Sequence, residues 1–129
     1  MPHTLTHGID LVDIARFERT LADHPDRFRE RCFTEAERAY AASRPKRESQ
    51  HLAARFAAKE AVLKAIGTGW RDGIAWTDIE VKLLPSGAPT LEVGGKAGEV
   101  AAELGITGWL ISLSHTDTHA IASVIGLGD

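Results

Sequence analysis

A helix that carries a carboxylate on its apolar face is the strongest constraint in this sequence. Residues 55–66 read RFAAKEAVLKAI, and four side chains on and before this segment follow one another at spacings of four, four and three: Leu52, Phe56, Glu60 and Leu63. These spacings place them on one helical face, which is expected to pack inward. A buried carboxylate is costly unless it is paired, hydrogen-bonded or bound to a cation. The helix therefore predicts a partner for Glu60.

The segment itself leaves two kinds of partner open. Lys59 and Lys64 flank Glu60, and Lys64 lies one turn further along the helix. A Glu–Lys pair at this spacing contributes only about 0.2–0.5 kcal/mol and is common on protein surfaces. Lys64 could instead bind an anionic ligand. The rest of the chain has to decide between an ordinary helix salt bridge and a functional site.

Length and composition predict one compact domain over residues 1–129. Of these residues 43% are apolar, and a chain of this size buries roughly two thirds of its unfolded surface. The sequence has no repeat, low-complexity tract or long linker. Its single cysteine, Cys32, excludes an internal disulfide and a multi-cysteine metal site, suits a reducing compartment, and is interpreted as a small apolar filler.

The termini and the charge exclude several classes of function. The start, MPHTLTHGID, has neither the basic flank nor the apolar run of a signal peptide, and no segment has the roughly 18 apolar residues of a membrane span. We therefore expect a cytoplasmic protein with no membrane partner. The net charge of −3 argues against nucleic acid as the main partner, because phosphate backbones require a basic field.

The first half of the chain is predicted to be a strand followed by helices. Apolar and polar residues alternate through the strand, and Asp13 is placed to cap the helix that follows. Thr34 and Glu37 form a capping box for the next helix. The predicted elements are a strand over 5–12, a helix over 14–23 ended by His24 and Pro25, a helix over 34–44 stopped by Pro45, and a helix over 49–66 stopped by Gly67.

The second half is predicted to be mainly strands. They follow the turn-rich segment over 70–73. The predicted elements are a hairpin of strands 79–84 and 90–93 around a turn over 85–89, a helix over 96–104 closed by Gly105, and strands 109–114 and 119–125 separated by 116–118. Helices cluster early and strands late, so the order favours an α+β fold over regular βαβ alternation.

Three polar residues stand out from their surroundings: Asp10, Glu60 and His115. Asp10 shares a strand face with Gly8 and Val12, and Gly8 leaves room for a close approach to the backbone. His115 ends an apolar strand, where a histidine is more often structural than functional. Two carboxylates without cysteines suit Mg²⁺, with waters and substrate phosphates completing the octahedron, and a lysine one turn away could hold a phosphate oxygen.

Three segments resemble the signatures of the 4′-phosphopantetheinyl transferase superfamily: GIDLVDIARF at 8–17, RFAAKEAVLKAIGTG at 55–69 and SLSHTDTHAIA at 112–122. The middle signature is the most specific. Chain length, motif order and the segment RFRERCFTEAE are most similar to the small bacterial branch, the holo-[acyl-carrier-protein] synthases. The resemblance covers essentially the whole chain. It implies the single-domain fold of that superfamily, an antiparallel sheet packed against helices, and a homotrimer with active sites between neighbouring subunits.

The implied activity is transfer of the 4′-phosphopantetheine arm of coenzyme A to a serine of apo acyl carrier protein in fatty acid biosynthesis, leaving adenosine 3′,5′-bisphosphate. A bridging Mg²⁺ would neutralise the pyrophosphate whose bond is broken. By their match to family positions, Asp10 and Glu60 are the expected Mg²⁺ ligands and, with Lys64, the catalytic residues. The proton of the serine could pass to a Mg²⁺-bound water or to Glu60. The residues matched to coenzyme A contacts are Lys64, Gly67, His115 and Thr116.

The resemblance also implies a docking surface for the carrier protein. Carrier proteins present an acidic helix, so the complementary face should be basic. The residues matched to carrier contacts are Arg16, Arg27, Phe28 and Arg31. The same region holds Glu18, Asp23, Asp26 and Glu30, so only arginines sorted onto one face would steer an acidic partner. A solvated surface of mixed charge is the alternative.

Two positions depart from the family pattern. Thr6 replaces the first glycine of the opening motif, and Ala88 stands where a lysine is usual. Either affinity for the adenosine end of coenzyme A is weaker than usual, or Lys82 or Lys96 supplies it. There are also two rival functions. One rival is a non-catalytic coenzyme A or nucleotide-binding module, which would not need the two carboxylates and Lys64. The other is a transferase for the carrier of a polyketide or peptide synthase, which the sequence does not separate from the fatty acid enzyme.

Three tryptophans bear on the implied trimer: Trp70, Trp76 and Trp109. The chain has few helices to cover both faces of its sheet, so surplus apolar sheet surface would mark an interface. Alternatively, the tryptophans simply complete the core of the monomer.

Overall fold

The elements of the computed structural model, which describes residues 1–69 and 73–129, follow the predicted order of a strand, a run of helices and then strands. The strands are β1 (His3–Asp13), β2 (Ile79–Leu83), β3 (Pro89–Val93), β4 (Gly108–His115) and β5 (His119–Gly128). The helices are α1 (Ile14–Asp23), α2 (Pro25–Cys32), α3 (Glu35–Ala42), α4 (Glu48–Ala65) and α5 (Gly95–Glu103), with 3₁₀ turns η1 (Pro45–Arg47) and η2 (Trp76–Asp78). Most of the turn predicted over 70–73 lies outside the described residues.

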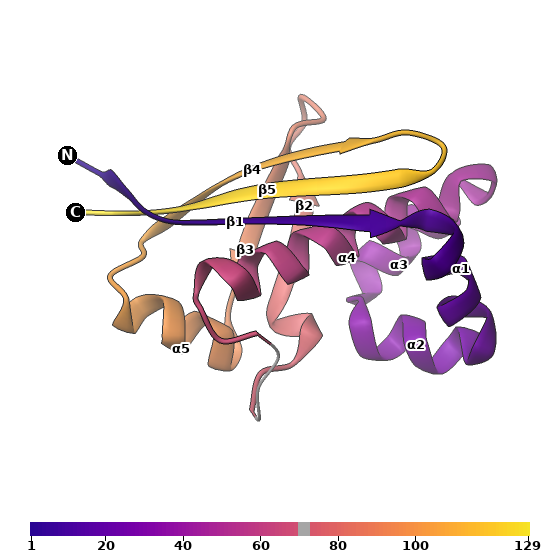
Figure 1. Ribbon diagram of the computed structural model, residues 1–129, viewed down its shortest axis with the longest axis horizontal. Coiled ribbons are helices and arrows are strands. Elements are labelled where there is room, and N and C mark those ends of the chain that lie inside the picture. Colours follow the sequence, from indigo (N-terminus) through magenta and orange to yellow (C-terminus); the bar gives the residue numbers. More distant parts are fainter. Residues whose placement is uncertain (70–72) are drawn as a thin grey trace.

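The strands form two antiparallel sheets. The larger has the order β1-β5-β4, so the two ends of the chain pair with each other and β5 is central. The predicted hairpin of β2 and β3 is confirmed and forms the smaller sheet, beside the end of α4 (Figure 1). The α+β class is thus confirmed, with antiparallel strands packed against helices.

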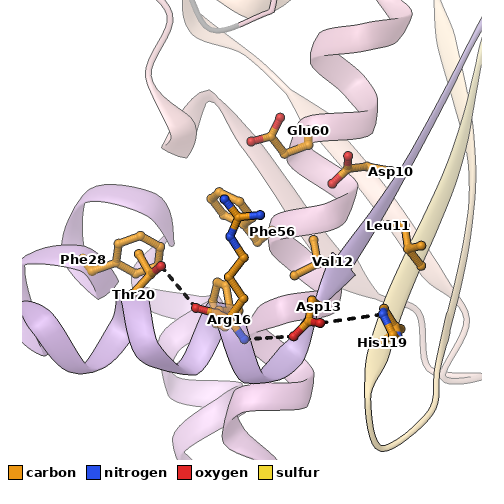
Figure 2. Close-up of a pocket in the computed structure, with 11 residues that line it drawn as sticks. Asp10, Leu11, Val12, Asp13, Arg16, Thr20, Phe28, Phe56, Glu60 and His119 are labelled. Atoms are coloured by element: carbon orange, nitrogen blue, oxygen red, sulfur yellow. Dashed lines mark hydrogen bonds and ion pairs between the residues drawn. The ribbon is translucent and has the colours of Figure 1, made fainter.

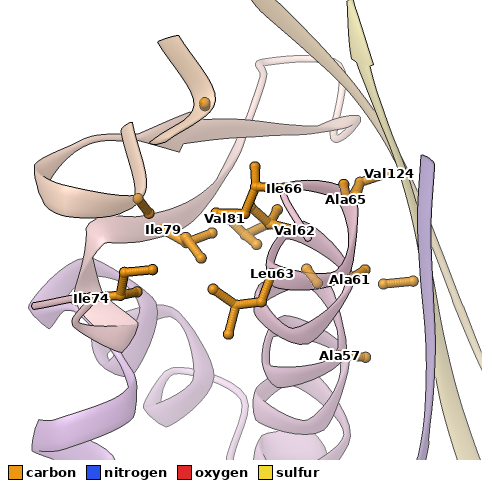
Figure 3. Close-up of a cluster of buried hydrophobic side chains, with 14 of the residues drawn as sticks. Ala57, Ala61, Val62, Leu63, Ala65, Ile66, Ile74, Ile79, Val81 and Val124 are labelled. Atoms are coloured by element: carbon orange, nitrogen blue, oxygen red, sulfur yellow. The ribbon is translucent and has the colours of Figure 1, made fainter. Parts of the chain in front are cut away.

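Helix α4 is the centre of the molecule. It contacts β1 and β5 on one side and α1, α3 and β2 on others. In Figure 3, Ala57, Ala61 and Ala65 face the larger sheet, whereas Val62 and Ile66 point toward the hairpin. A helix that is apolar on nearly all sides belongs in a core, which explains why α4 is the long central helix. The membrane-span criterion is not met by any helix in the described part of the chain.

The space predicted beside Gly8 is confirmed, and α4 fills it. A Cβ atom on Gly8 would collide with the carbonyl oxygen of Ala61. Strand and helix therefore approach each other as closely as a bare backbone allows. Gly8 lies two residues before Asp10, and Ala61 directly follows Glu60, so this contact fixes how near the two acidic residues come.

Helix α2 was missed by the sequence prediction, although the end of α1 was placed correctly. Pro25 does not only terminate a helix; it occupies the first turn of the next one, where its missing N–H costs nothing. The short helix brings Phe28 into contact with Phe17 and Phe33, with ring centroids 5.6 and 6.3 Å apart. Cys32 is buried beside them, as expected of a filler, and burial raises the pKa of its thiol to about 11.

A buried ion pair joins α3, α4 and β2. Lys59 Nζ lies 2.9 Å from Glu37 Oε1, and both side chains are fully inaccessible to solvent. The same ammonium donates to the carbonyl oxygens of Trp76 and Ile79, while Glu37 accepts from Thr34 N and Val81 N. Burial lowers the pKa of Lys59, and the Glu37 charge opposes that shift. The capping box predicted at Thr34 is confirmed. Lys59, which flanks Glu60 in the sequence, pairs with Glu37.

The second face of the larger sheet carries exposed leucines around the polar pair of His7 and Ser123, and no described element covers these leucines. Alternation along β1 turns Gly8 and Asp10 toward α4 and leaves Leu5, Ile9 and Leu11 exposed, Leu11 to 61%. Leu110 on β4 is also 54% exposed. Trp76 and Trp109 are not the source of this surface, because both pack against the core. Trp70 lies outside the described residues.

Candidate active site

The two predicted metal-ligand carboxylates line one cavity of about 500 Å³. Asp10 enters it from β1 and Glu60 from α4, as Figure 2 shows. Helices α1 and α2 form the opposite wall, and the start of β5 closes one end. The remaining polar lining residues are Asp13, Arg16, Thr20 and His119. The structure therefore brings Asp10 and Glu60 together in a cavity that also contains Arg16 and Phe28, two of the residues predicted to contact a carrier.

Glu60 is half-buried and electrostatically strained. Burial raises the pKa of its carboxyl, and the negative charge of Asp10 raises that pKa further, while Lys64 lowers it. The sequence placed Glu60 on an inward face beside Leu52 and Leu63. Those two are buried, but Glu60 sits at the edge of that face and opens into the cavity.

Lys64 makes its ion pair with β1, not along its own helix with Glu60. Its Nζ donates to Asp10 Oδ1 and to the carbonyl oxygen of Ile9, both at 2.9 Å. The ordinary i to i+4 helix pair is thus replaced by a contact between two elements. An ammonium has three donors, so one remains for a ligand beside the carboxylates.

The donor set fits Mg²⁺ better than a metal held entirely by protein. Within the described ranges, no three His, Cys, Asp or Glu side chains are grouped to hold an ion. Mg²⁺ is usually bound by one or two carboxylates, with waters and phosphate oxygens filling the other positions. Asp10 and Glu60 supply such a pair, and a cation between them would relieve the repulsion that raises the pKa of Glu60.

The residues predicted to contact a carrier are placed around the same opening. Arg16 and Phe28 line the main cavity. Arg31 lines an adjoining cavity of about 290 Å³ that shares Phe28 and Phe56 with the first. Arg27 is exposed on α2. Their roles as carrier contacts stay predictions.

The residues predicted to contact coenzyme A are divided between two places. Gly67 follows α4 with φ of 76°, the left-handed conformation of a helix C-terminus, close to Lys64. His115, in contrast, lines a separate cavity of about 210 Å³ with Tyr40, His51 and Arg55. Thr116 follows it in the turn after β4. Within one subunit, His115 does not line the cavity that contains the carboxylates.

Sequence reasoning missed two groups of side chains. Arg55 is buried in the second cavity, with its guanidinium carbon 4.4 Å from the centre of the Tyr40 ring, and the Arg44 guanidinium lies 4.0 Å from that centre. The other group is Asp13 with His119 in the main cavity. Arg55 and His119 both lie inside the matched signatures, so the signal was their position there. Asp13 also lies inside a signature, whereas Tyr40 and Arg44 lie outside all three and gave no signal.

Comparison with known proteins identifies the class and then the branch. Residues 7–123 match the model of the 4′-phosphopantetheinyl transferase superfamily, and the chain belongs to that superfamily. Within this superfamily the chain is similar to the holo-[acyl-carrier-protein] synthases. It is 47% identical to the holo-[acyl-carrier-protein] synthase of Geobacter sulfurreducens over 118 residues, which cover 92% of this chain and 93% of that protein.

Solved structures agree with this assignment. The holo-(acyl-carrier-protein) synthase of Bacillus anthracis, in complex with coenzyme A (3′,5′-ADP), is 33% identical with a TM-score of 0.80, and the alignment covers 98% of both chains. The acyl carrier protein synthase of Plasmodium yoelii with ADP bound is 28% identical with a TM-score of 0.88, covering 100% of this chain and 98% of that one.

Proposed function

We propose that this chain is a holo-[acyl-carrier-protein] synthase, which transfers the 4′-phosphopantetheine arm of coenzyme A to a serine of apo acyl carrier protein. Adenosine 3′,5′-bisphosphate is the second product. The observation that carries the proposal is the cavity lined by both Asp10 and Glu60, with Lys64 paired to Asp10, beside the arginine-bearing helix α1. A module that only binds coenzyme A would have no need for a strained pair of carboxylates at this position.

The side chains of the cavity divide the chemistry between them. Asp10 and Glu60 would hold Mg²⁺, which when bound neutralises the pyrophosphate of coenzyme A. Lys64 supplies a point charge for a pyrophosphate oxygen. The serine oxygen forms a bond to the phosphorus of the arm as the bond from that phosphorus to the nucleotide phosphate oxygen breaks. Glu60 or a water beside it would accept the serine proton.

Assembly into a homotrimer is part of the proposal. The exposed apolar face around Leu5, Ile9, Leu11 and Leu110 is the kind of surface that a second subunit covers. The cavity at His115 is separate from the one at Asp10 and Glu60, so a neighbouring subunit could bring the two together. Arg55 places a positive charge in the His115 cavity, which suits the nucleotide end of coenzyme A.

The choice of carrier is the least constrained part of the proposal. The relatives named above are synthases for acyl carrier protein, which favours a role in fatty acid biosynthesis over a polyketide or peptide synthase carrier. Comparing the rates of modification of the different apo carriers would decide this. The cytoplasmic location stays a prediction from the sequence.

The test is the intact mass of apo acyl carrier protein after incubation with the protein, coenzyme A and Mg²⁺, with an EDTA control. We expect a gain of one phosphopantetheine that EDTA prevents.

Asp10→Asn and Glu60→Gln should each slow the transfer about 10²–10³-fold without unfolding the protein, since each removes a charge at the reacting phosphates. Glu103→Gln, at the exposed end of α5, is the matched control. Coenzyme A binding without any mass gain would contradict the proposal, and full activity of either variant would contradict the metal assignment.

A further inference from the structure

The turn between β4 and β5 lies against the first turn of α1. Ile14 N donates to the carbonyl oxygen of Thr118 at 2.9 Å, so the backbone of α1 begins on this turn. Asp13 caps the helix, because its Oδ1 accepts from Arg16 N at 2.9 Å. The other oxygen of the same carboxylate, Oδ2, lies 3.9 Å from His119 Nε2 (Figure 2). One carboxylate thus contacts both the helix and the turn.

The turn holds the His119 ring in one orientation. The second ring nitrogen, Nδ1, lies 2.9 Å from the Thr118 hydroxyl. Thr116 Oγ1 accepts from the backbone N–H of both Thr118 and His119, and Thr116 N donates to the carbonyl oxygen of His119. The His119 ring is thus connected to the turn through Nδ1 and faces Asp13 with Nε2.

The position of α1 matters because its first turn faces the reacting groups. Arg16 lies in that turn, and its side chain extends into the cavity in the direction of Glu60 (Figure 2). A tilt at the start of α1 would therefore move Arg16 relative to Asp10 and Glu60. Asp13 and His119 are about half exposed, at 51% and 46%, so their pairing is not needed to complete the core.

We propose that His119 is a positioning residue, which acts through Asp13 to fix the carrier-docking end of α1 relative to the carboxylates of the site. The inference rests on the proposed function, because it needs a carrier protein that docks on α1. It also links two parts of the sequence that the signatures treat separately, since the turn 116–119 belongs to the third signature and Asp13 to the first.

The first test compares affinity for the carrier with affinity for coenzyme A. Affinities are measured by titration calorimetry of the full-length protein with apo acyl carrier protein and, separately, with coenzyme A. His119→Ala should raise the Kd for the carrier about two- to fivefold, the range expected for an exposed ion pair. The Kd for coenzyme A and the melting temperature should stay close to those of wild type. Asp13→Asn should do the same, because Asn caps a helix as well as Asp but carries no charge.

The double variant separates positioning from direct contact. If His119 acts through Asp13, combining His119→Ala with Asp13→Asn should weaken carrier binding no more than either change alone. Additive losses would overturn the inference, because they would mean that each side chain touches the carrier independently. Carrier binding of His119→Ala equal to wild type, or equal losses of carrier and coenzyme A binding, would also overturn it.

Two controls keep the outcomes distinct. His3→Ala removes a histidine from the exposed start of β1 and should leave both affinities unchanged. A wild-type protein that neither binds nor modifies the carrier would contradict the proposed function. A wild-type protein that does both, beside a His119→Ala variant that binds equally well, would contradict only the role of His119.

Discussion

At the scale of single residues, Gly8 sets the geometry of the candidate site. It lies two residues from Asp10, and the helix residue it touches, Ala61, is the neighbour of Glu60. A side chain at this point would push β1 away from α4 and separate the two carboxylates. The absence of a side chain at Gly8 thus affects both the packing of β1 on α4 and the spacing of the two carboxylates.

Gly8→Ala is expected to lower the free energy of unfolding by about 3 kcal/mol, because the added methyl group meets a backbone carbonyl that cannot turn aside. The transfer rate at fixed, low Mg²⁺ should fall as well. Urea denaturation and the mass assay measure the two effects. Gly108→Ala is the matched control, since a Cβ there meets nothing within 4 Å. A Gly8→Ala variant as stable as wild type would contradict the packing described for β1 and α4.

At the scale of elements, the pair of Lys59 and Glu37 connects the helices to the hairpin. Each partner also bonds backbone groups: Lys59 those of η2 and β2, and Glu37 those at the start of α3 and in β2. Both charges are therefore compensated, as buried ions have to be. The pair holds α4 at one rotation, and that rotation directs Glu60 into the cavity.

Lys59→Met is expected to cost about 3–5 kcal/mol of folding free energy, since it leaves the Glu37 carboxylate buried without its cation. Adding Glu37→Gln should recover part of this loss, because no buried charge then remains while the amide oxygen still accepts a backbone hydrogen bond. Denaturant unfolding of the two variants is the measurement. Lys82→Met, on the exposed side of β2, is the control and should stay close to wild type. Equal stability of Lys59→Met and wild type would show that the pair contributes little.

At the scale of the whole molecule, the chain divides the predicted site residues between two cavities. The carboxylates and the arginine-bearing helix share one cavity, while His115 lines another, and an apolar sheet face is left uncovered by described elements. Covering that face with another subunit would bury the exposed leucines and could bring the His115 of one chain to the carboxylates of the next. Activity would then depend on assembly.

Mixing two inactive variants tests that arrangement. Glu60→Gln and His115→Ala should each have little activity alone. After co-expression, random cyclic trimers should regain about one quarter of the wild-type activity, because one site in four combines an intact Glu60 with an intact His115 from the neighbouring subunit. Two variants of the same residue, Glu60→Gln and Glu60→Ala, are the control and should not complement. Activity no greater than the sum of the separate variants would contradict a shared site.

Whether a feature could be predicted depends on how far apart in the sequence the interacting residues lie. The sequence determined the order of the elements and the caps at Asp13 and Thr34, because periodicity and capping act over a few neighbouring residues. The superfamily followed from the resemblance of the three signatures. It missed α2, since Pro25 ends one helix and begins another with the same chemistry.

Only the tertiary structure decided the partner of each charged group. Lys59 and Lys64 lie on either side of Glu60 in the sequence, yet one pairs with Glu37 in the core and the other with Asp10 at the cavity. Likewise, His119 meets Asp13 only because β5 pairs with β1 from the opposite end of the chain. A residue's type and spacing state what chemistry it can perform, but its partner depends on how distant elements pack, and no local pattern encodes that packing.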